Sequence, residues 1–170
     1  MTQDDGTASP SLRPVSPFDV ALLAELHARS FDPAWGPGEI ASLLASPGSF
    51  GLLAGRGAAP IGFLLGRAVA GEAEILSLGI LPEERRRGAG RALVAAAIDH
   101  ATRAGATRLF LEVADDNLAA RALYDTAGFR RVGRRVGYYR RAGGPVSAQV
   151  LERALSGSGA ADAGSSERLA

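Results

Sequence analysis

The segment EERRRGAGRALVAAAIDHA, residues 83–101, joins three arginines and two glycines to an apolar helical pattern. Its apolar residues recur at the spacing of one helix face and predict a buried stripe of Leu93, Val94, Ala97, Ile98 and Ala101. Residues 73–81 before the segment and 108–113 after it have the composition of strands. A strand, a helix and a second strand in this order predict two parallel strands joined by a crossover helix.

The glycines at the start of this helix favour an anion-binding site. The first N–H groups of a helix lack internal partners and carry partial positive charge, and Gly88 and Gly90 let a ligand approach the backbone closely. A Walker A loop is excluded because the chain has no lysine, and a dinucleotide-binding turn because Leu93 stands where its third glycine belongs. The pattern that remains is Gln/Arg-x-x-Gly-x-Gly/Ala, filled by Arg85, Gly88 and Gly90.

The rest of the chain extends this unit to an α/β fold with a mixed sheet and helices on both faces. Strands are predicted at 11–16, 50–55, 60–70, 129–139 and 146–155, and helices at 17–31, 37–48 and 117–129. The polar ends, residues 1–10 and 156–170, are predicted to be disordered, which leaves one domain over 11–155.

Composition narrows the possible chemistry. With 170 residues, 46% hydrophobic and 22% charged, the chain is predicted to be soluble, and the lack of a signal peptide or apolar span predicts a cytoplasmic protein without membrane contact. The absence of cysteine excludes disulfides and thiolate chemistry. His27 and His100 are interpreted as surface or half-buried helix residues rather than metal ligands, and a net charge of +1 implies no general affinity for nucleic acid.

The stretches GILPEERRRGAGRAL and LFLEVADDNLAARALYDTAGF resemble the GCN5-related N-acetyltransferases (GNAT), most closely the RimI-like branch that acetylates protein N-termini. The resemblance covers about residues 11–153, with its specific motifs between 75 and 139. It implies the GNAT acyl-CoA N-acyltransferase fold, with about seven strands and about four helices, and acetyl-CoA as co-substrate without a metal. It also implies that backbone amides bind the coenzyme's pyrophosphate, with arginine side chains as helpers, at Arg85, Arg86, Arg87, Gly88, Ala89, Gly90 and Arg91.

The strand before the loop is predicted to alternate, with Leu76, Leu78 and Ile80 on one side and Ser77 and Gly79 on the other. Alternation alone assigns no role to these residues. The resemblance implies that main-chain groups around Leu78 and Ile80 hold the acetyl carbonyl and the pantetheine amides, which supplies oxyanion donors without a side chain.

Glu112 ends a strand that is expected to be buried, where a carboxyl group is unusual. Desolvation would make it a better proton acceptor near neutral pH, and the resemblance implies a general base, acting directly or through water. The alternative is an ion pair with a neighbouring arginine such as Arg108.

Tyr124 lies seven residues beyond Asn117, so both are expected on one face of the helix predicted at 117–129. The resemblance implies that Tyr124 is the general acid that returns a proton to the departing sulfur, and that Asn117 and Tyr124 contact the coenzyme. In the alternative interpretation Tyr124 is a core aromatic residue and Asn117 a helix N-cap, and both interpretations can hold together.

FDPAWGPGEI and RRVGRRVGYY resemble segments that border the acceptor groove in RimI-like proteins, which implies peptide contacts for Trp35, Tyr138 and Tyr139. Plain packing is an equal alternative for Trp35. Six arginines between 130 and 141 suggest RNA binding, but a solvated sheet edge is favoured over direct nucleic-acid contact. The last strand departs from the RimI-like pattern at Ser147 and Gln149.

The acceptor is predicted to be a protein or peptide N-terminus, because an α-amine of pKa ~7.7 to 8.0 is partly neutral at physiological pH whereas a lysine amine of pKa ~10.4 is charged. Two alternatives remain: an acetyltransferase for a small amine or antibiotic, and a silent acyl-CoA-binding module. A monomer or weak dimer is expected.

Overall fold

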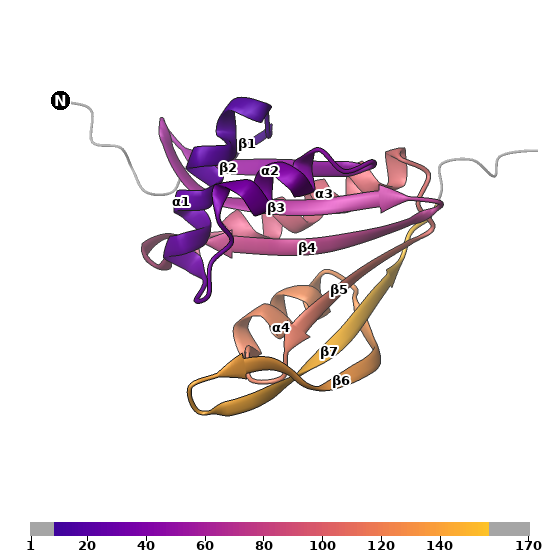
Figure 1. The fold of residues 1–170 in the computed structure, drawn as a ribbon. Coiled ribbons are helices and arrows are strands. Elements are labelled where there is room, and N and C mark those ends of the chain that lie inside the picture. Colours follow the sequence, from indigo (N-terminus) through magenta and orange to yellow (C-terminus); the bar gives the residue numbers. More distant parts are fainter. Residues whose placement is uncertain (1–8, 157–170) are drawn as a thin grey trace, which may run out of the picture.

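The computed structural model describes residues 9–156, which form one seven-stranded sheet in the order β1-β2-β3-β4-β5-β7-β6 (Figure 1). The strands are β1 (Ser11–Pro14), β2 (Ser49–Arg56), β3 (Ala59–Val69), β4 (Glu72–Ile80), β5 (Arg108–Ala114), β6 (Arg130–Arg141) and β7 (Gly144–Ala154). β4 and β5 are parallel, as predicted, and the other neighbouring pairs are antiparallel. The predicted disordered ends lie almost wholly outside the described residues.

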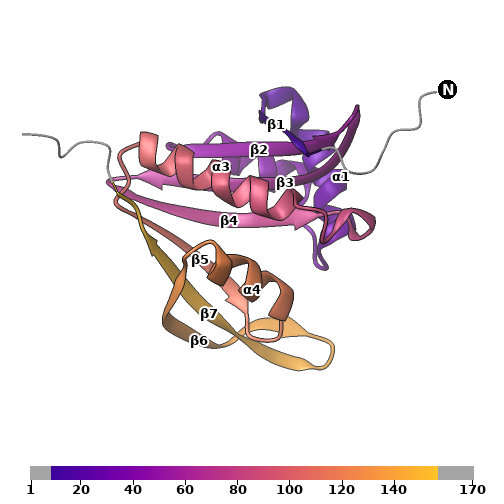
Figure 2. The same cartoon turned by 180° about the vertical axis from the view of Figure 1, so that it is seen from behind.

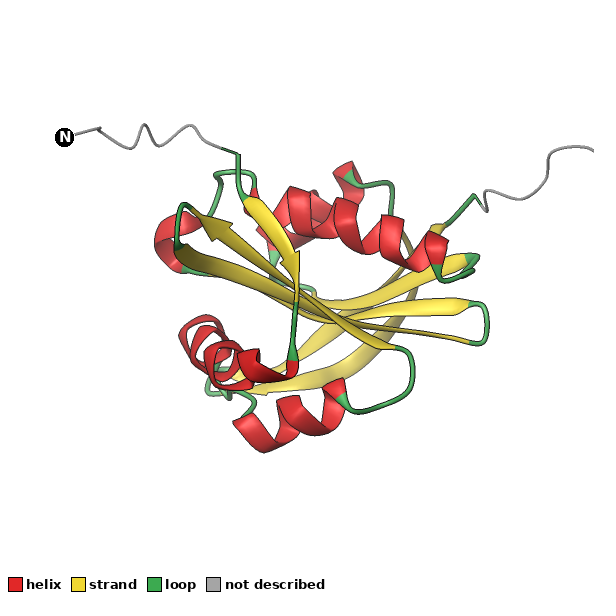
Figure 3. Cartoon of the chain, turned by 90° about the horizontal axis from the view of Figure 1, so that it is seen from above, coloured by secondary structure: helices red, strands yellow, loops and turns green. Residues whose placement is uncertain are grey.

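The helices are α1 (Val20–Ser30), α2 (Pro37–Leu44), α3 (Ala89–Arg103) and α4 (Leu118–Thr126), and short 3-10 turns cover Pro17–Asp19 and Pro82–Glu84. α1 and α2 lie in front of the sheet in Figure 1, while α3 and α4 lie in front in the reverse view of Figure 2. Figure 3 shows helices on both sides of the sheet, as the sequence predicts. No helix of residues 9–156 is long and apolar enough to cross a membrane.

Each face of the sheet has its own apolar core. The α3 core includes the predicted stripe: Leu93, Val94, Ala97 and Ala101 are buried, and Ile98 packs against them partly buried. The α1–α2 core lies on the opposite face and contains Leu23, Leu26, Ile40, Leu53, Phe63, Leu65 and Leu81. Burial of these side chains drives both helical layers onto the sheet.

The sheet opens between β4 and β5. Their parallel register runs from Glu72 opposite Arg108 to Ile75 opposite Leu111. Figure 1 shows the two strands diverging toward their carboxyl ends. Leu76 is bulged out of the β3–β4 register, since Leu65 pairs with Ser77 and Gly66 with Ile75. A bulge bends its strand and increases its twist, which accounts for the separation. Carboxyl ends of parallel strands that part in this way are where α/β sheets bind ligands.

Because of the bulge, the alternation of side chains predicted for residues 76–80 does not include Leu76. Strict alternation begins only at Ser77, because the pairing slips by one residue at Leu76. From there Leu78 and Ile80 pack against the α3 core, and Ser77 contacts His27 of α1 on the other face. Main-chain groups of β4 beyond Ile75 therefore face the opening.

Candidate functional site

The loop before α3 has the backbone of an anion-binding turn. Gly88 is the N-cap residue with a φ of 88°, a left-handed conformation that favours glycine, and Arg86 has a φ of 63°. The first hydrogen bond of the helix runs from the Ala92 N–H to the Gly88 carbonyl at 3.0 Å. The amides of Ala89, Gly90 and Arg91 therefore lie before the first internal bond, at the positive end of the helix dipole.

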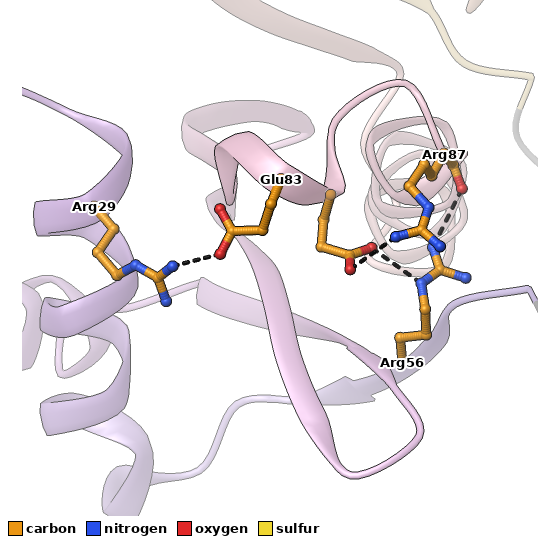
Figure 4. Close-up of polar contacts among 5 residues, drawn as sticks. Arg29, Arg56, Glu83 and Arg87 are labelled. Carbon is orange, nitrogen blue, oxygen red and sulfur yellow. Dashed lines mark hydrogen bonds and ion pairs between the residues drawn. The ribbon is translucent and has the colours of Figure 1, made fainter. Parts of the chain in front are cut away.

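Arginine side chains brace this loop (Figure 4). The Glu84 carboxylate accepts hydrogen bonds from Arg56 Nε and Arg87 Nη1, each at 3.0 Å, and Arg56 Nη2 reaches the Arg87 carbonyl at 3.4 Å. Arg85 Nε donates to the Ile80 carbonyl at 3.1 Å. The predicted helper role of the arginines is thus accompanied by a structural role in fixing the loop.

The other end of the same turn is tied to α1. Arg29 Nη2 donates to Glu83 Oε1 at 2.5 Å, which Figure 4 shows reaching across from the helix. Both side chains are about half exposed, so solvent screens this pair and its contribution to stability is small.

A cavity of about 380 Å³ continues from the loop between α3 and α4. It is lined by Arg91, Ala95, Ile98, Asp99, Leu123, Thr126, Ala127 and Arg153. The two helices approach closely at Gly90, where a Cβ atom would lie 3.2 Å from Leu123 Cδ2. An amide-lined turn beside a cavity with two guanidinium groups, those of Arg91 and Arg153, fits a ligand that carries phosphates on a long chain.

Glu112 lies on β5 directly after the strands part. Its Oε1 is 2.7 Å from Arg135 Nε of β6, and its side chain is 16% exposed. The arginine partner is therefore Arg135; Arg108, the neighbour considered from sequence, pairs with Glu72 and lies over the ring of Phe110. Glu112 is half-buried rather than fully buried.

Glu74 is a second carboxyl group beside Glu112 that sequence reasoning missed. It pairs with Phe110 in the register of β4 and β5, so its side chain lies on the same sheet face as that of Glu112 two residues later. Burial, followed by the negative charge of Glu112, raises the pKa of Glu74, while Arg67 and Arg135 partly oppose this. The available sequence signal was an acidic residue directly before the apolar residues Ile75 and Leu76.

Tyr124 of α4 is buried in the α3 core, with its ring edge-on to Phe129 at 5.7 Å. Burial raises the pKa of Tyr124 to about 12, so the phenol keeps its proton throughout the physiological range. Asn117 is the N-cap of α4, since its Oδ1 accepts the Ala120 N–H at 3.1 Å, as the alternative interpretation anticipated. Asn117 is exposed and Tyr124 is buried, so the two side chains lie in different environments.

The three residues expected to contact an acceptor fall in two places. Tyr138 and Tyr139 meet edge to face at 5.0 Å, and the Tyr138 hydroxyl donates to Glu112, which raises the pKa of Tyr138. Trp35 follows α1 and packs partly buried against the α1–α2 core. Packing therefore holds for Trp35, and its peptide contact stays a prediction.

The arginines of β6 line an exposed sheet edge, as predicted, and Arg134 and Arg141 pair with Asp115 and Asp116.

His27 is buried, with 3% exposure, whereas a surface or half-buried position was predicted. The rings of Phe31, Trp35 and Phe63 lie against its imidazole, and helical periodicity does not reveal the contacts that come from outside α1.

Ser147 and Gln149, the departures in the last strand, are both hydrogen-bonded. Ser147 Oγ accepts the Gly137 N–H at 3.2 Å, where β6 bulges from the register of β7. Gln149 is buried and bonds the Asp115 side chain in the loop after β5. These residues hold the end of β5 and the Tyr138–Tyr139 segment in place.

Comparison with known proteins agrees with this geometry. Residues 20–129 match the model of the Acetyltransferase (GNAT) family. The chain is 40% identical over 131 residues to N-alpha-acetyltransferase RimI of Mycobacterium tuberculosis, covering 74% of this chain and 81% of the relative. It is 34% identical over 94 residues to the [Ribosomal protein bS18]-alanine N-acetyltransferase of Escherichia coli, covering 55% of this chain and 64% of the relative.

Solved structures show the same architecture. The crystal structure of the ribosomal-protein-S18-alanine N-acetyltransferase from Escherichia coli superposes with a TM-score of 0.83 at 25% identity, covering 89% of this chain and 97% of the other. Arabidopsis thaliana NAA60 in complex with a bisubstrate analogue gives 0.77 at 21% identity, covering 88% and 100%, which bears on the fold alone. The seven-stranded mixed sheet with four helices is therefore the predicted fold.

Proposed function

Since the chain belongs to the GNAT acetyltransferase family, we propose that this N-acetyltransferase acts on the N-terminal α-amine of a protein, by direct transfer with Glu112 as general base and Tyr124 as general acid. The family uses acetyl-CoA, which supplies a thioester carbonyl and a thiolate leaving group. The observation that carries the choice of acceptor is the 40% identity to a RimI protein over 81% of that relative. A ribosomal protein N-terminus is the proposed substrate class, in the cytoplasm.

On the donor side, the amides of Ala89, Gly90 and Arg91 would hold the pyrophosphate. The register between β4 and β5 ends at Ile75, so in the described sheet the β4 main chain near Leu78 and Ile80 faces the opening instead of a paired strand. Groups of this kind are fixed before the reaction and donate hydrogen bonds to an oxyanion at little reorganisation cost. The Gly88 turn and the cavity between α3 and α4 support this assignment.

On the acceptor side, Glu112 takes the proton of an α-ammonium group, directly or through water, and leaves a neutral amine that attacks the thioester carbonyl. An α-amine of pKa ~7.7 to 8.0 needs only a modest base, unlike lysine at ~10.4. Trp35, Tyr138 and Tyr139 would flank the peptide. The hydrogen bond from Tyr138 to Glu112 would hold the base at the groove.

Tyr124 acts on the leaving group mainly as a hydrogen-bond donor. Its pKa of about 12 exceeds that of a thiol, ~8.5, so complete transfer of its proton to the thiolate is uphill by roughly 5 kcal/mol. A donor that never ionises at working pH is always in the correct protonation state. Its proton then passes to sulfur only as the thiolate departs and solvent re-protonates the phenol.

The test is an acceptor panel with release of free thiol as the readout. It compares peptides with a free N-terminus, the same peptides with a blocked N-terminus and one internal lysine, and small amines. We expect turnover only with free N-termini. Turnover only with small amines would identify a small-molecule acetyltransferase, and binding of acetyl-CoA without any turnover would identify a silent binding module.

A further inference from the structure

His27 lies within a cluster of rings at the end of α1. Its imidazole is 4.6 Å from the ring of Phe31, 5.5 Å from Phe63 of β3 and 4.9 Å from Trp35, and it stacks on Trp35 with an interplanar angle of 17°. Burial of a polar ring is costly unless its nitrogens are hydrogen-bonded. Both ring nitrogens of His27 are hydrogen-bonded.

The hydrogen bonds of His27 fix its tautomer. The Trp35 backbone N–H donates to Nδ1 at 3.1 Å, so Nδ1 carries the lone pair. The single proton of the neutral ring is then on Nε2, which lies 3.3 Å from Ser77 Oγ and donates to it. His27 in this state cannot accept the Ser77 proton, which excludes a serine nucleophile activated by His27. The two hydrogen bonds therefore indicate a structural role for His27 and not a catalytic one.

The two contacts connect two parts of the proposed site. Trp35 belongs to the segment 31–36 between α1 and α2, and Ser77 follows the Leu76 bulge and precedes Leu78 on β4. A rigid imidazole therefore spans from the acceptor segment to the strand that would hold the acetyl group. Ser30, near the end of the same helix, approaches β4 at Gly79, where a Cβ would lie 2.9 Å from its Oγ.

We propose that neutral His27 is a positioning residue that sets the distance between the Trp35 segment and β4, and through it the placement of the acceptor peptide. This role rests on the proposed function, because it takes Trp35 as a wall of the acceptor groove. A ring that merely filled the α1–α2 core would need neither hydrogen bond. Phenylalanine would then replace it without effect on the site.

The experiment compares three substitutions that separate the two bonds. His27→Phe removes both while keeping a ring, His27→Asn keeps an acceptor near the position of Nδ1, and His27→Gln keeps a donor near that of Nε2. The readouts are hydrogen exchange of the Trp35 amide, the emission of this single tryptophan, and KM and kcat for peptide and acetyl-CoA. His100→Phe is the matched control. The ring of His100 stacks on that of Phe50, with their centroids 4.0 Å apart, and belongs to α3 and not to the Trp35 segment.

We expect His27→Phe to abolish protection of the Trp35 amide and to raise KM for the peptide about tenfold, the usual size for one lost hydrogen bond, with KM for acetyl-CoA nearly unchanged. His27→Asn should recover most of the protection and of the peptide KM, and His27→Gln should not. The Asn variant keeps the test decisive if the Phe variant unfolds. His100→Phe should match the wild type.

Unchanged exchange at Trp35 in His27→Phe would overturn the positioning role, as would lost protection with an unchanged acceptor KM. These outcomes are distinct from failure of the proposed function, in which the wild-type protein itself does not acetylate peptide N-termini. In that case the exchange data and the KM of the amine that is turned over decide the role of His27.

Discussion

Glu112 of β5 and Arg135 of β6 form an ion pair of 2.7 Å over the intervening strand β7. The arginine side chain is 57% exposed on the edge strand, whereas the carboxylate is mostly shielded. A pair with one solvated partner contributes roughly 0–1 kcal/mol. In the proposed mechanism, an incoming ammonium group would therefore displace Arg135 at little cost and take its place beside Glu112.

Replacing Glu112 by Gln removes the proposed base without changing its shape. We expect kcat to fall by roughly 10²–10⁴-fold, the usual contribution of general base catalysis, with the Kd for acetyl-CoA kept within about twofold. Thiol release measures the rate, and calorimetry measures binding. Glu72→Gln is the control, because Glu72 forms a similar ion pair at the exposed start of β4. An unchanged kcat in Glu112→Gln would remove the base from the mechanism.

Replacing Arg135 by Gln should strengthen the binding of the acceptor peptide. Since Arg135 occupies the carboxylate that an α-ammonium group would bind, we expect KM for the peptide to fall about 1.4- to fivefold, in keeping with a pair worth roughly 0.2–1 kcal/mol. The matched variant is Arg134→Gln, which loses an ion pair with Asp115 instead. If both variants shift KM equally, the effect comes from net charge and not from competition at Glu112.

Replacing Tyr124 by Phe tests its proposed role as hydrogen-bond donor to the leaving group. We expect kcat to fall at least tenfold, with acetyl-CoA affinity largely retained, because the lost hydrogen bond acts on charge that develops in the transition state. Ultraviolet titration of the three tyrosines checks the protonation state: the wild type should show a component near pH 12 that Tyr124→Phe lacks. A Tyr124 component near pH 10 would contradict its burial.

Much of the fold is predictable because it follows from local patterns. The apolar stripe from Leu93 to Ala101 favours a helix, and Gly88 at its start permits a left-handed turn, so the strand–helix–strand unit and its candidate anion-binding turn follow from about forty residues. The exposed arginine edge at β6 follows in the same way from composition.

Features that depend on contacts between distant segments are not predictable in this way. The bulge at Leu76 arises where β3 and β4 pair, and it decides where the sheet opens. The partner of Glu112 lies 23 positions away on a strand whose register is itself irregular. The burial of His27 needs α1, the Trp35 segment and β4 to meet, and no spacing within α1 encodes that.

The Arg13–Asp19 clip should make stability sensitive to acid. Asp19 accepts hydrogen bonds from both terminal nitrogens of Arg13, at 2.8 and 2.7 Å, and from the Ser16 amide and hydroxyl. These bonds, that from Arg13 first, hold the pKa of Asp19 well below its ordinary value. A depressed pKa contributes stability that is present above about pH 4 and is lost as the pH falls toward the folded-state value.

Asp19→Asn should therefore lower the free energy of unfolding at pH 7 by about 1–3 kcal/mol, measured by urea titration. Its difference from the wild type should shrink below about pH 4. Asp125→Asn, on the exposed part of α4, is the control and should be near neutral. A difference that stays constant from pH 7 to pH 3 would exclude the charge of Asp19 as its source.

The pKa of Glu74 reports the electrostatic field of the charged groups beside β4 and β5. Burial raises the pKa of its carboxyl group first, and the charge of Glu112 adds to this, whereas Arg67 lowers it. Titration of the Glu74 carboxyl carbon by NMR should thus give a lower pKa in Glu112→Gln and a higher pKa in Arg67→Gln than in the wild type. The opposite signs make the pair of variants its own control.

The raised pKa also has a consequence for stability. The fold disfavours the ionised form of Glu74, so this group destabilises the protein increasingly as the pH rises from about 4 through its folded-state pKa. Glu74→Gln removes the charge, and its free energy of unfolding should rise relative to the wild type between about pH 4 and pH 7. A variant that becomes relatively less stable over that range would mean that Glu74 is stabilised as a carboxylate, and that Arg67 and Arg135 outweigh its burial.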